Sequence, residues 1–500
     1  MLASVRTYAL VGVEARDVTV EVDVTSGLPA FAVVGLPDAA VRESRERVRA
    51  AIVNSGFDFP QQRITASLAP ADLRKAGPGF DLAIAAALLA ACEQLPLGAL
   101  AGCALAAELA LDGRLRPVPG ALAMAERAGA AGLERLVVAS ESAYEAALPG
   151  TLDDDAAPRI VPIERLADLI RLGTDDEPSR PTPELRRTEP VAGPDLADLR
   201  GQPVLREALE VAAAGGHGML ILGPPGSGKS LAARRLPSIM PPLSDPEAIE
   251  VMRIASASGR AAERAPARPF RAPHHTISAA GLVGGGSPPR PGEVTMAHRG
   301  VLFLDELGEF SRSALEALRQ PLEDGSVRIT RVRHSVSLPS RFLLVAASNP
   351  CPCGYGEDDP ACQCTPGAAR RYRSRISGAL ADRIDLSLTV EQPSADALSG
   401  SAGESSEAVR SRVMDAREVA RLRQGSPNAE LDPATVRRHA RLTPRARAEL
   451  AIGHRTMKLS GRAHDRVLRV ARTVADLQGC ERVGADQIAT ALTLRRRGAG

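Results

Sequence analysis

The chain carries the octapeptide Gly223-Pro224-Pro225-Gly226-Ser227-Gly228-Lys229-Ser230 directly after the apolar run Met219–Leu222. This pattern is typical of a phosphate-binding loop between a strand and a helix. Glycines let backbone N–H groups turn toward the phosphates, Lys229 reaches the β and γ phosphates, and the Ser230 hydroxyl holds Mg²⁺. Because each demanded position is filled, we predict that the octapeptide binds ATP together with Mg²⁺.

Two further strands supply polar residues to the same predicted site. The apolar residues 301–304 precede Asp305 and Glu306, as in a buried parallel strand. Asp305 can bind Mg²⁺ through water, and Glu306 can polarise the attacking water. A strand over residues 342–347 leads to Asn349, which can hydrogen-bond the γ-phosphate or the lytic water. We predict that these three residues are catalytic; the alternative is an ordinary strand end for the acids and a turn before Pro350 for Asn349.

Length and composition indicate a globular protein of about three or four domains. Hydrophobic residues make up 44% of the chain, which is ordinary for a soluble protein. No secretory signal is visible at the start, and no apolar stretch is long enough to span a bilayer. We therefore expect a cytoplasmic protein without a membrane partner, whose seven cysteines are thiols or metal ligands rather than disulfides.

Composition and periodicity predict an α/β fold that ends in a helical segment. Strands are expected over 18–24, 64–68, 103–109 and 136–139, and helices over 37–54 and 80–91. Helical periodicity then fills 409–422, 433–440, 444–457, 461–477 and 485–494. The predicted layout is an N-terminal unit (1–170), a linker (171–194), a nucleotide-binding core with a parallel sheet (195–392), a flexible join (393–407) and a C-terminal helical lid (408–500).

Basic residues are concentrated at the C-terminal end. Residues 410–497 contain 19 Arg, one Lys and nine acidic residues, a local charge of +11, whereas the whole chain carries +2. A basic segment beside an acidic body indicates a polyanionic partner such as DNA. The alternative is a solvated helix face in which arginine reflects the base composition of the genome.

The segment 326–338 has the pattern of a β-hairpin, because apolar residues alternate on both sides of a central basic tip. Arg328, Arg331 and Arg333 lie on it and would suit phosphate contacts that do not depend on base sequence. We predict that these arginines bind DNA; a solvated hairpin is the alternative. No aromatic cluster accompanies them, so base stacking is not expected.

Two Cys-x-Cys pairs, Cys351/Cys353 and Cys362/Cys364, are separated by a short polar loop. Four thiolates on one chain reversal suit a tetrahedral Zn²⁺ of structural type. Because the spacing is tighter than the usual Cys-x₂-Cys, reduced or redox-active thiols stay open as the alternative.

These motifs, in this order, resemble the AAA+ ATPases. The stretches Pro269-Phe270-Arg271-Ala272-Pro273-His274-His275-Thr276 and Ala297–Leu307 resemble the magnesium-chelatase-like ATPases in particular. Within these, Asp382-Arg383-Ile384-Asp385 and Arg472–Leu477 are similar to the ComM/YifB group. The resemblance covers nearly the whole chain.

The resemblance implies a hexameric ring that acts as a branch-migration helicase in recombination during natural transformation. It implies that Arg383 enters the ATP site of the neighbouring subunit, where a guanidinium stabilises charge on the transferring phosphoryl group. It also implies that Arg462 is the lid arginine that senses nucleotide, with Arg466 as a substitute, and that the hairpin projects into the ring pore. A metal-chelatase-type motor for a partner enzyme is the alternative function.

The N-terminal stretch Lys75–Ala83 resembles the peptidase domain of Lon proteases, and the unit is compatible with a ribosomal-S5-like fold. Where that family has its nucleophilic serine, this chain has Gly79-Phe80-Asp81. No hydroxyl is present there to attack a carbonyl. A Lon-like ATP-dependent protease is therefore disfavoured, and the domain is expected to serve assembly or DNA contact.

Overall fold

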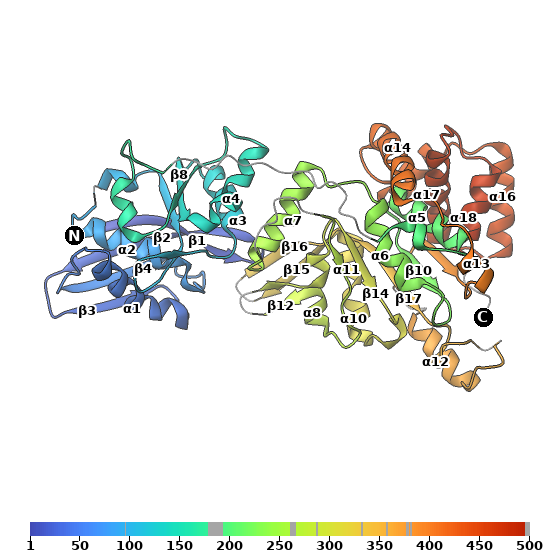
Figure 1. Cartoon of the computed structure of the whole chain (residues 1–500), viewed down its shortest axis with the longest axis horizontal. Coiled ribbons are helices and arrows are strands. Elements are labelled where there is room, and N and C mark those ends of the chain that lie inside the picture. The colour runs from blue at the N-terminus through green and yellow to red at the C-terminus, as the bar shows by residue number, and fades with distance from the viewer. Residues whose placement is uncertain are drawn as a thin grey trace.

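The computed structural model arranges the chain in three consecutive parts, coloured from blue to red in Figure 1. It describes residues 1–95, 97–178, 194–260, 267–286, 289–331, 334–356, 359–376, 380 and 383–495. The fold is mixed α/β with a parallel sheet at its centre, as predicted.

The N-terminal part is a mixed sheet in the order β3-β4-β2-β1-β5-β8-β9. β1, β2 and β4 pair antiparallel, and the other neighbours pair parallel. Buried residues alternate along β2, which places one face of that strand on the core. The strand bounds are β1 Leu2–Val11, β2 Glu14–Thr25, β3 Ala30–Val34, β4 Arg63–Ala69, β5 Cys103–Ala106, β8 Arg135–Ala139 and β9 Arg159–Ile163; β6 (Glu108–Leu109) and β7 (Leu115–Arg116) form a short separate pair.

Helices of the N-terminal part cover this sheet. Every residue of α2 (Asp81–Ala91) is buried, and its Ala- and Leu-rich sequence packs on β1 and β2. α1 (Ala39–Asn54) begins where the Asp38 carboxylate accepts a hydrogen bond from the Val41 N–H at 2.9 Å, an N-terminal cap. α3 (Ala121–Ala130) and α4 (Ala143–Ala147) complete this part. The predicted helices 37–54 and 80–91 and the predicted strands 18–24, 64–68 and 136–139 are confirmed, whereas residues 103–109 form two short strands, β5 and β6, in place of one.

The central part is a parallel sheet in the order β11-β14-β17-β10-β18. Its inner strands are short and almost entirely buried, which is why their sequences are continuous apolar runs. The bounds are β10 Met219–Leu222, β11 Phe270–Arg271, β14 Val301–Leu304, β17 Leu343–Ser348 and β18 Leu386–Thr389. Helices α5 (Pro203–Gly215), α6 (Lys229–Ile239) and α7 (Asp245–Ala257) follow or precede them, with short elements α8 (Ala279–Val283), β12 (Gly284–Gly285), β13 (Arg290–Pro291), α9 (Glu293–Met296), α10 (Arg312–Ala317), α11 (Arg319–Asp324) and α12 (Pro366–Ile376).

The C-terminal part is helical, as predicted, and shares one hydrophobic core with α5, α6 and one face of the central sheet. Side-chain caps fix its helix starts: Asp432, Thr443 and Ser460 each accept a hydrogen bond from the first turn. The bounds are α14 Ser406–Gln424, α15 Pro433–Ala440, α16 Pro444–Thr456, α17 Gly461–Leu477 and α18 Ala485–Thr493.

The two predicted connections are more structured than their polar composition indicated. Glu177, in the predicted linker, is buried against Arg135 of β8 at 3.1 Å, so this end of the linker is part of the N-terminal unit. Residues 179–193 of the linker lie outside the described residues. The predicted flexible join contains α13 (Ala395–Ser399), and Arg206 binds the Glu404 carbonyl at 2.7 Å. The remaining domain boundaries stay predictions.

The predicted hairpin is present and rests on the N-terminal part. β15 (Ser326–Arg331) pairs antiparallel with β16 (His334–Pro339). The turn between β1 and β2 packs against it: Val13 is buried in one cluster with Val327, Val336 and Leu338. A Cβ on Gly12 would lie 2.6 Å from a Val336 methyl carbon, so the Gly12 backbone packs directly against side chains of the hairpin and leaves no room for a side chain of its own.

A second contact joins α7 to the N-terminal part. Ile249 and Met252 of α7 are buried in one cluster with Leu122 and Leu148. Arg253 of the same helix pairs with Glu126 at 3.2 Å.

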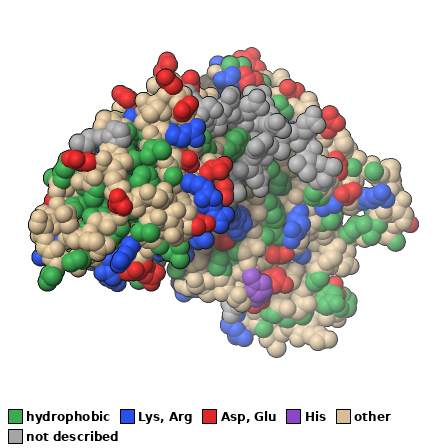
Figure 2. All heavy atoms as spheres, turned by 60° about the vertical axis from the view of Figure 1, so that its left-hand side comes forward, with side chains coloured by type: hydrophobic (Ala, Val, Ile, Leu, Met, Phe, Trp, Pro, Cys, Tyr) green, Lys and Arg blue, Asp and Glu red, His purple; other side chains and the backbone are tan. Residues whose placement is uncertain are grey.

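On the face drawn in Figure 2, Lys and Arg side chains are interspersed with Asp and Glu side chains. Among the residues that the structure describes, no helix is long and apolar enough to cross a membrane.

Candidate active site

The octapeptide forms the turn between β10 and α6, at the carboxyl edge of the parallel sheet. Gly226 and Gly228 have φ of +80° and +86°, a backbone conformation that glycine adopts without strain. A Cβ on Gly223 would lie 2.4 Å from the Val390 carbonyl oxygen. Gly223, Gly226 and Gly228 are therefore needed for the shape of the loop, and the α6 N-terminus that follows favours a bound anion.

Lys229 is held within the loop. Its Nζ donates to the carbonyl oxygens of Gly223 at 2.7 Å and Pro224 at 2.8 Å, and to Asn349 Oδ1 at 3.2 Å. Burial lowers the pKa of Lys229 below its ordinary value, while Asp305 opposes this shift. An anion bound at the loop would act as the counter-ion of the Lys229 ammonium.

The two predicted Mg²⁺ ligands meet across the sheet. Ser230 lies in the first turn of α6 and Asp305 follows β14, yet Ser230 Oγ donates to Asp305 Oδ2 at 2.7 Å. Because β10 and β14 both pair parallel with β17, their carboxyl ends lie at the same edge of the sheet. A hydroxyl and a carboxylate are hard oxygen donors of the kind that Mg²⁺ prefers, so these residues fit the ion.

Glu306 has an unusual backbone and a partner that sequence reasoning missed. Its φ is +52°, which is uncommon for a residue other than glycine and is typical of functional sites. Its carboxylate, 55% exposed, lies 3.3 Å from His275 Nδ1. His275 belongs to the stretch 269–276 on which the family resemblance rests, but nothing in its spacing indicated this contact.

Gln202 is a second supporting residue that the sequence did not reveal. Its side chain is buried, and its amide donates to the carbonyl oxygens of Ser227 at 3.2 Å and Glu391 at 2.6 Å. It thereby ties the phosphate-binding loop to the strand end of β18. An isolated glutamine before Pro203 carries no sequence signal for this role.

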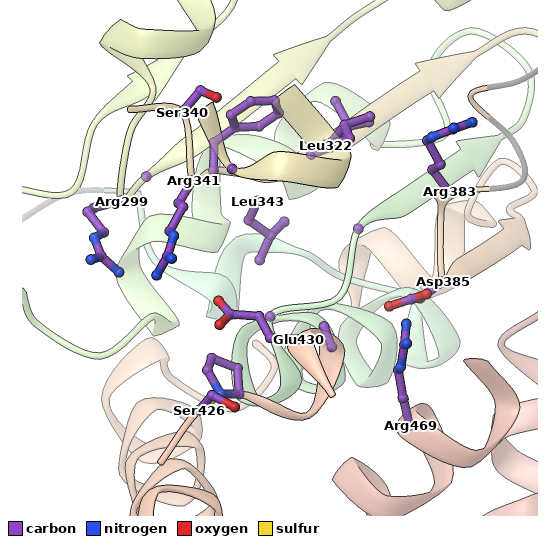
Figure 3. Close-up of a pocket in the computed structure, with 18 of the residues that line it drawn as sticks. Arg299, Leu322, Ser340, Arg341, Leu343, Arg383, Asp385, Ser426, Glu430 and Arg469 are labelled. Carbon is purple, nitrogen blue, oxygen red and sulfur yellow. The ribbon is translucent and has the colours of Figure 1, made fainter. Parts of the chain in front are cut away.

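The predicted arginines lie at the opposite edge of the sheet. A cavity of about 980 Å³ is lined by the residues that start the strands, such as Gly218 and Leu343, and by Arg383 and Arg462. Figure 3 shows Arg383 and Asp385 on one side of it and Arg299 with Arg341 on the other. The four residues of β10 separate this edge from the phosphate-binding loop by about 13 Å.

The arginines that line this cavity form different ion pairs. Arg383 forms an ion pair with Glu323, and Arg466 lies 3.3 Å from Asp385. Arg462 is exposed. Both Arg383 and Arg462 line this cavity, and no residue of the octapeptide does.

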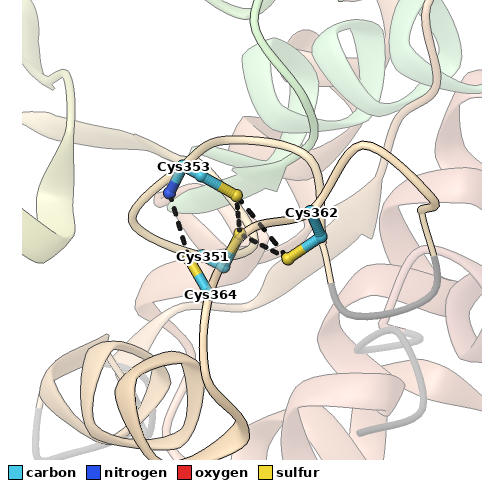
Figure 4. Close-up of side chains that lie close together, drawn as sticks. All are labelled: Cys351, Cys353, Cys362 and Cys364. Atoms are coloured by element: carbon cyan, nitrogen blue, oxygen red, sulfur yellow. Dashed lines mark hydrogen bonds between the residues drawn. The ribbon is translucent and has the colours of Figure 1, made fainter.

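The four cysteines, which follow Asn349 in the sequence, come together in space (Figure 4). Their sulfur atoms all lie within 4.8 Å of one another, although they are drawn from two separate pairs. Cys351 is buried and the other three are half-buried. A hydrogen bond from the Tyr355 backbone is the largest influence lowering the pKa of Cys353, to about 6, whereas desolvation and the neighbouring thiols raise the pKa of Cys362 and of Cys364.

The predicted DNA-binding arginines are only partly described. Arg328 is exposed on β15, and the Arg331 backbone pairs with His334 at the end of the hairpin. Arg333 lies outside the described residues.

At the Lon-like stretch, Lys75 and Asp81 are both buried. Asp81 pairs with Arg47 at 2.7 Å and accepts from Ser44, which satisfies its charge within the core. Gly79 packs on Val118. Asp81 thereby joins α2 to α1, and the place of the nucleophile holds no hydroxyl.

A phosphate-binding loop, an acidic strand end and an Asn-bearing strand on one parallel sheet, followed by a helical domain, define a P-loop protein of the AAA+ ATPase class. Comparison with known families gives a finer placement. The family "Magnesium chelatase, subunit ChlI" matches residues 195–398, "Subunit ChlI of Mg-chelatase" matches 20–142, and "Magnesium chelatase, subunit ChlI C-terminal" matches 403–495.

Three relatives match over almost their whole length. The uncharacterized protein YifB of Salmonella typhimurium is 42% identical over 99% of this chain and 97% of its own. The uncharacterized protein Rv2897c of Mycobacterium tuberculosis is 44% identical over 99% and 98%. The competence protein ComM of Haemophilus influenzae is 41% identical over 99% and 97%. The chain belongs to the ComM/YifB family of magnesium-chelatase-like proteins.

Proposed function

We propose that this chain hydrolyses ATP with Mg²⁺, assembles into a ring of identical subunits, hexameric as the family resemblance implies, and moves along DNA as a branch-migration helicase. The observation that carries the proposal is the division of the catalytic groups between two edges of one sheet. Lys229, Ser230, Asp305 and Asn349 gather at the carboxyl edge, whereas Arg383 and Arg462 line the amino edge. Each ATP site is completed only when the amino edge of a neighbour faces it.

Within this site, each residue has one role. Mg²⁺ held by Ser230 and Asp305 would neutralise phosphate charge. Lys229 would bind the phosphates, and Asn349, which already contacts the Lys229 ammonium, would orient the γ-phosphate or the water. Glu306 would polarise the attacking water, with His275 holding its carboxylate. Arg383 of the neighbour would stabilise the transition state, and Arg462 would sense the nucleotide from the same side.

The decisive experiment is ATP-dependent displacement of a strand from branched DNA. We expect displacement with ATP, none with a non-hydrolysable analogue, and faster phosphate release when DNA is present. A metal-chelatase-type motor is the alternative favoured by the family descriptions. Such a motor would hydrolyse ATP at a rate that DNA leaves unchanged.

Replacing Glu306 by glutamine is expected to leave ATP binding intact and to lower kcat by about 10²-fold or more, because the water loses its base. Steady-state phosphate release and binding of a fluorescent ATP analogue measure the two effects. Glu309→Gln is the matched control, since it removes a nearby exposed carboxylate. Normal turnover in Glu306→Gln would remove Glu306 from this role.

DNA affinity is expected to fall steeply with salt, since arginines that neutralise phosphates release bound counterions. A site with about six such contacts loses roughly 10³-fold in affinity between 50 and 200 mM salt. Fluorescence anisotropy with a labelled fork measures the slope, which Arg328→Gln should reduce and Arg114→Gln, on an exposed turn of the N-terminal part, should not. An affinity independent of salt would reject phosphate contacts.

The cysteine cluster is proposed to hold a structural Zn²⁺. Zn–S bonds of about 2.3 Å in a tetrahedron separate the sulfur atoms by about 3.8 Å. The Sγ atoms of Cys351 and Cys362 lie 3.8 Å apart and those of Cys353 and Cys362 lie 3.6 Å apart, whereas those of Cys351 and Cys353 lie closer, at 3.2 Å. This spacing, together with the soft thiolate donors, fits Zn²⁺.

A further inference from the structure

The cysteine cluster touches the phosphate-binding loop directly. Gly354, between the first pair of cysteines and the polar loop, has φ of +98°, and a Cβ on it would lie 2.9 Å from two ring carbons of Pro225. Pro225 is a residue of the octapeptide, and its carbonyl oxygen also accepts a hydrogen bond from Gln392 at 2.6 Å. The loop that carries the cysteines therefore packs directly against the phosphate-binding loop.

The same cluster is joined to the catalytic amide. Asn349, which accepts a hydrogen bond from the Lys229 ammonium, precedes Cys351 by two residues. Cys351 is fully buried, and the Gly356 N–H donates to its sulfur at 3.2 Å. Fixing the Cys351 sulfur thus fixes the chain immediately after Asn349.

The chain that leaves the cluster reaches the acidic strand end. Cys364 is followed by α12, whose Tyr372 ring is buried. A Cβ on Gly308, in the turn after Glu306, would lie 2.4 Å from the Tyr372 ring carbon that bears the hydroxyl. The Tyr372 hydroxyl also lies 3.5 Å from Ser348 Oγ. The cluster is therefore connected to three parts of the candidate site: the phosphate-binding loop, Asn349 and the turn that carries Glu306.

We propose that a Zn²⁺ ion bound by Cys351, Cys353, Cys362 and Cys364 holds the phosphate-binding loop in its nucleotide-binding shape, so that nucleotide affinity depends on metal occupancy. Without the ion, four thiols that share no covalent link leave Gly354 free to withdraw from Pro225. Packed interiors transmit such displacements to their neighbours. This inference rests on the proposed ATP site.

The first test measures metal and nucleotide in the full-length protein. Elemental analysis of protein purified without chelators is expected to give about one zinc per chain. Protein stripped of metal under reducing conditions should bind a fluorescent ATP analogue at least tenfold more weakly, and added Zn²⁺ should restore binding. Cys362→Ser should lose both zinc and affinity, whereas Cys480→Ser, outside the cluster, should keep both.

The second test keeps all four ligands and alters only the contact. Gly354→Ala places a methyl group against Pro225 and should weaken nucleotide binding at least tenfold while retaining zinc. Gly479→Ala is the control for backbone strain, because Gly479 also has a positive φ, +65°, but no atom within 4 Å of its Cβ position. This variant keeps the proposal testable if metal removal unfolds the protein, which circular dichroism would reveal.

Each outcome has one meaning. Zinc near zero in the untreated protein, or nucleotide affinity within twofold of normal after stripping and in Gly354→Ala, overturns the proposed coupling. If the zinc-loaded wild-type protein fails to bind the analogue, the proposed ATP site is wrong as well. Binding by wild type that survives metal removal rejects the coupling alone.

Discussion

An Arg383→Ala variant is expected to bind ATP normally and to hydrolyse it about 10³-fold more slowly, the lower end of what a guanidinium delivered by a neighbour contributes. Arg383 lines the amino edge of its own sheet, whereas Lys229 lies beyond the carboxyl edge. In the proposed ring it would therefore act on the ATP of another subunit. Phosphate release and analogue binding, measured on the assembled protein, separate the two effects.

Mixing experiments make this prediction specific. Arg383→Ala and Lys229→Ala subunits, each inactive alone, should regain hydrolysis when combined, because some interfaces then join an intact Lys229 to an intact Arg383. Arg319→Ala, which breaks an exposed pair with Glu316, is the control and should stay close to wild type. Mixtures without any recovered activity would contradict a site shared between subunits.

Lys229→Ala is expected to lower ATP hydrolysis to the background rate and to abolish strand displacement. The Lys229 ammonium is the cation that the octapeptide itself brings to the phosphates, and the surrounding carbonyl oxygens of Gly223 and Pro224 would repel them. Initial rates of phosphate release at saturating ATP measure this loss.

The control for Lys229→Ala is Lys458→Gln, which removes a lysine charge from the turn between α16 and α17. It should leave hydrolysis near the wild-type rate. Thermal unfolding of both variants shows whether either change disturbs the fold. If Lys229→Ala kept more than a tenth of the wild-type rate, the octapeptide would not be the hydrolytic site.

Periodicity and loop motifs predicted most of the elements that position the site. β10, β14 and β17 were found because buried parallel strands are short apolar runs followed by polar residues. The lid helices were found from their spacing and from Pro433 and Pro444 at first turns. β3 and β9 were missed because short apolar segments fit a strand or a buried helix equally well. β1 was missed although its first buried residues alternate with exposed ones.

Contacts between distant segments could not be predicted from the sequence. The His275–Glu306 contact and the position of Gln202 beneath the loop depend on how strands far apart in sequence align. Composition also misled at both connections, since Glu177 and the Glu404 carbonyl find arginine partners that a polar segment does not reveal. The resemblance assigned Arg462 to nucleotide sensing, but only the fold places it beside Arg383 at the amino edge.

The seating of the β1–β2 turn on the β15–β16 hairpin has a mechanical consequence. Val13 is buried among hairpin residues and Gly12 lies against the Val336 side chain, so the turn and the hairpin are closely packed. α7 contacts the N-terminal part at a second point through Met252 and Arg253. With two separate contacts, the N-terminal part cannot rotate about one of them without breaking the other. Close-packed contacts are also hard to deform. If the hairpin moves during the proposed hydrolysis cycle, we therefore expect the N-terminal part to move with it as one rigid body.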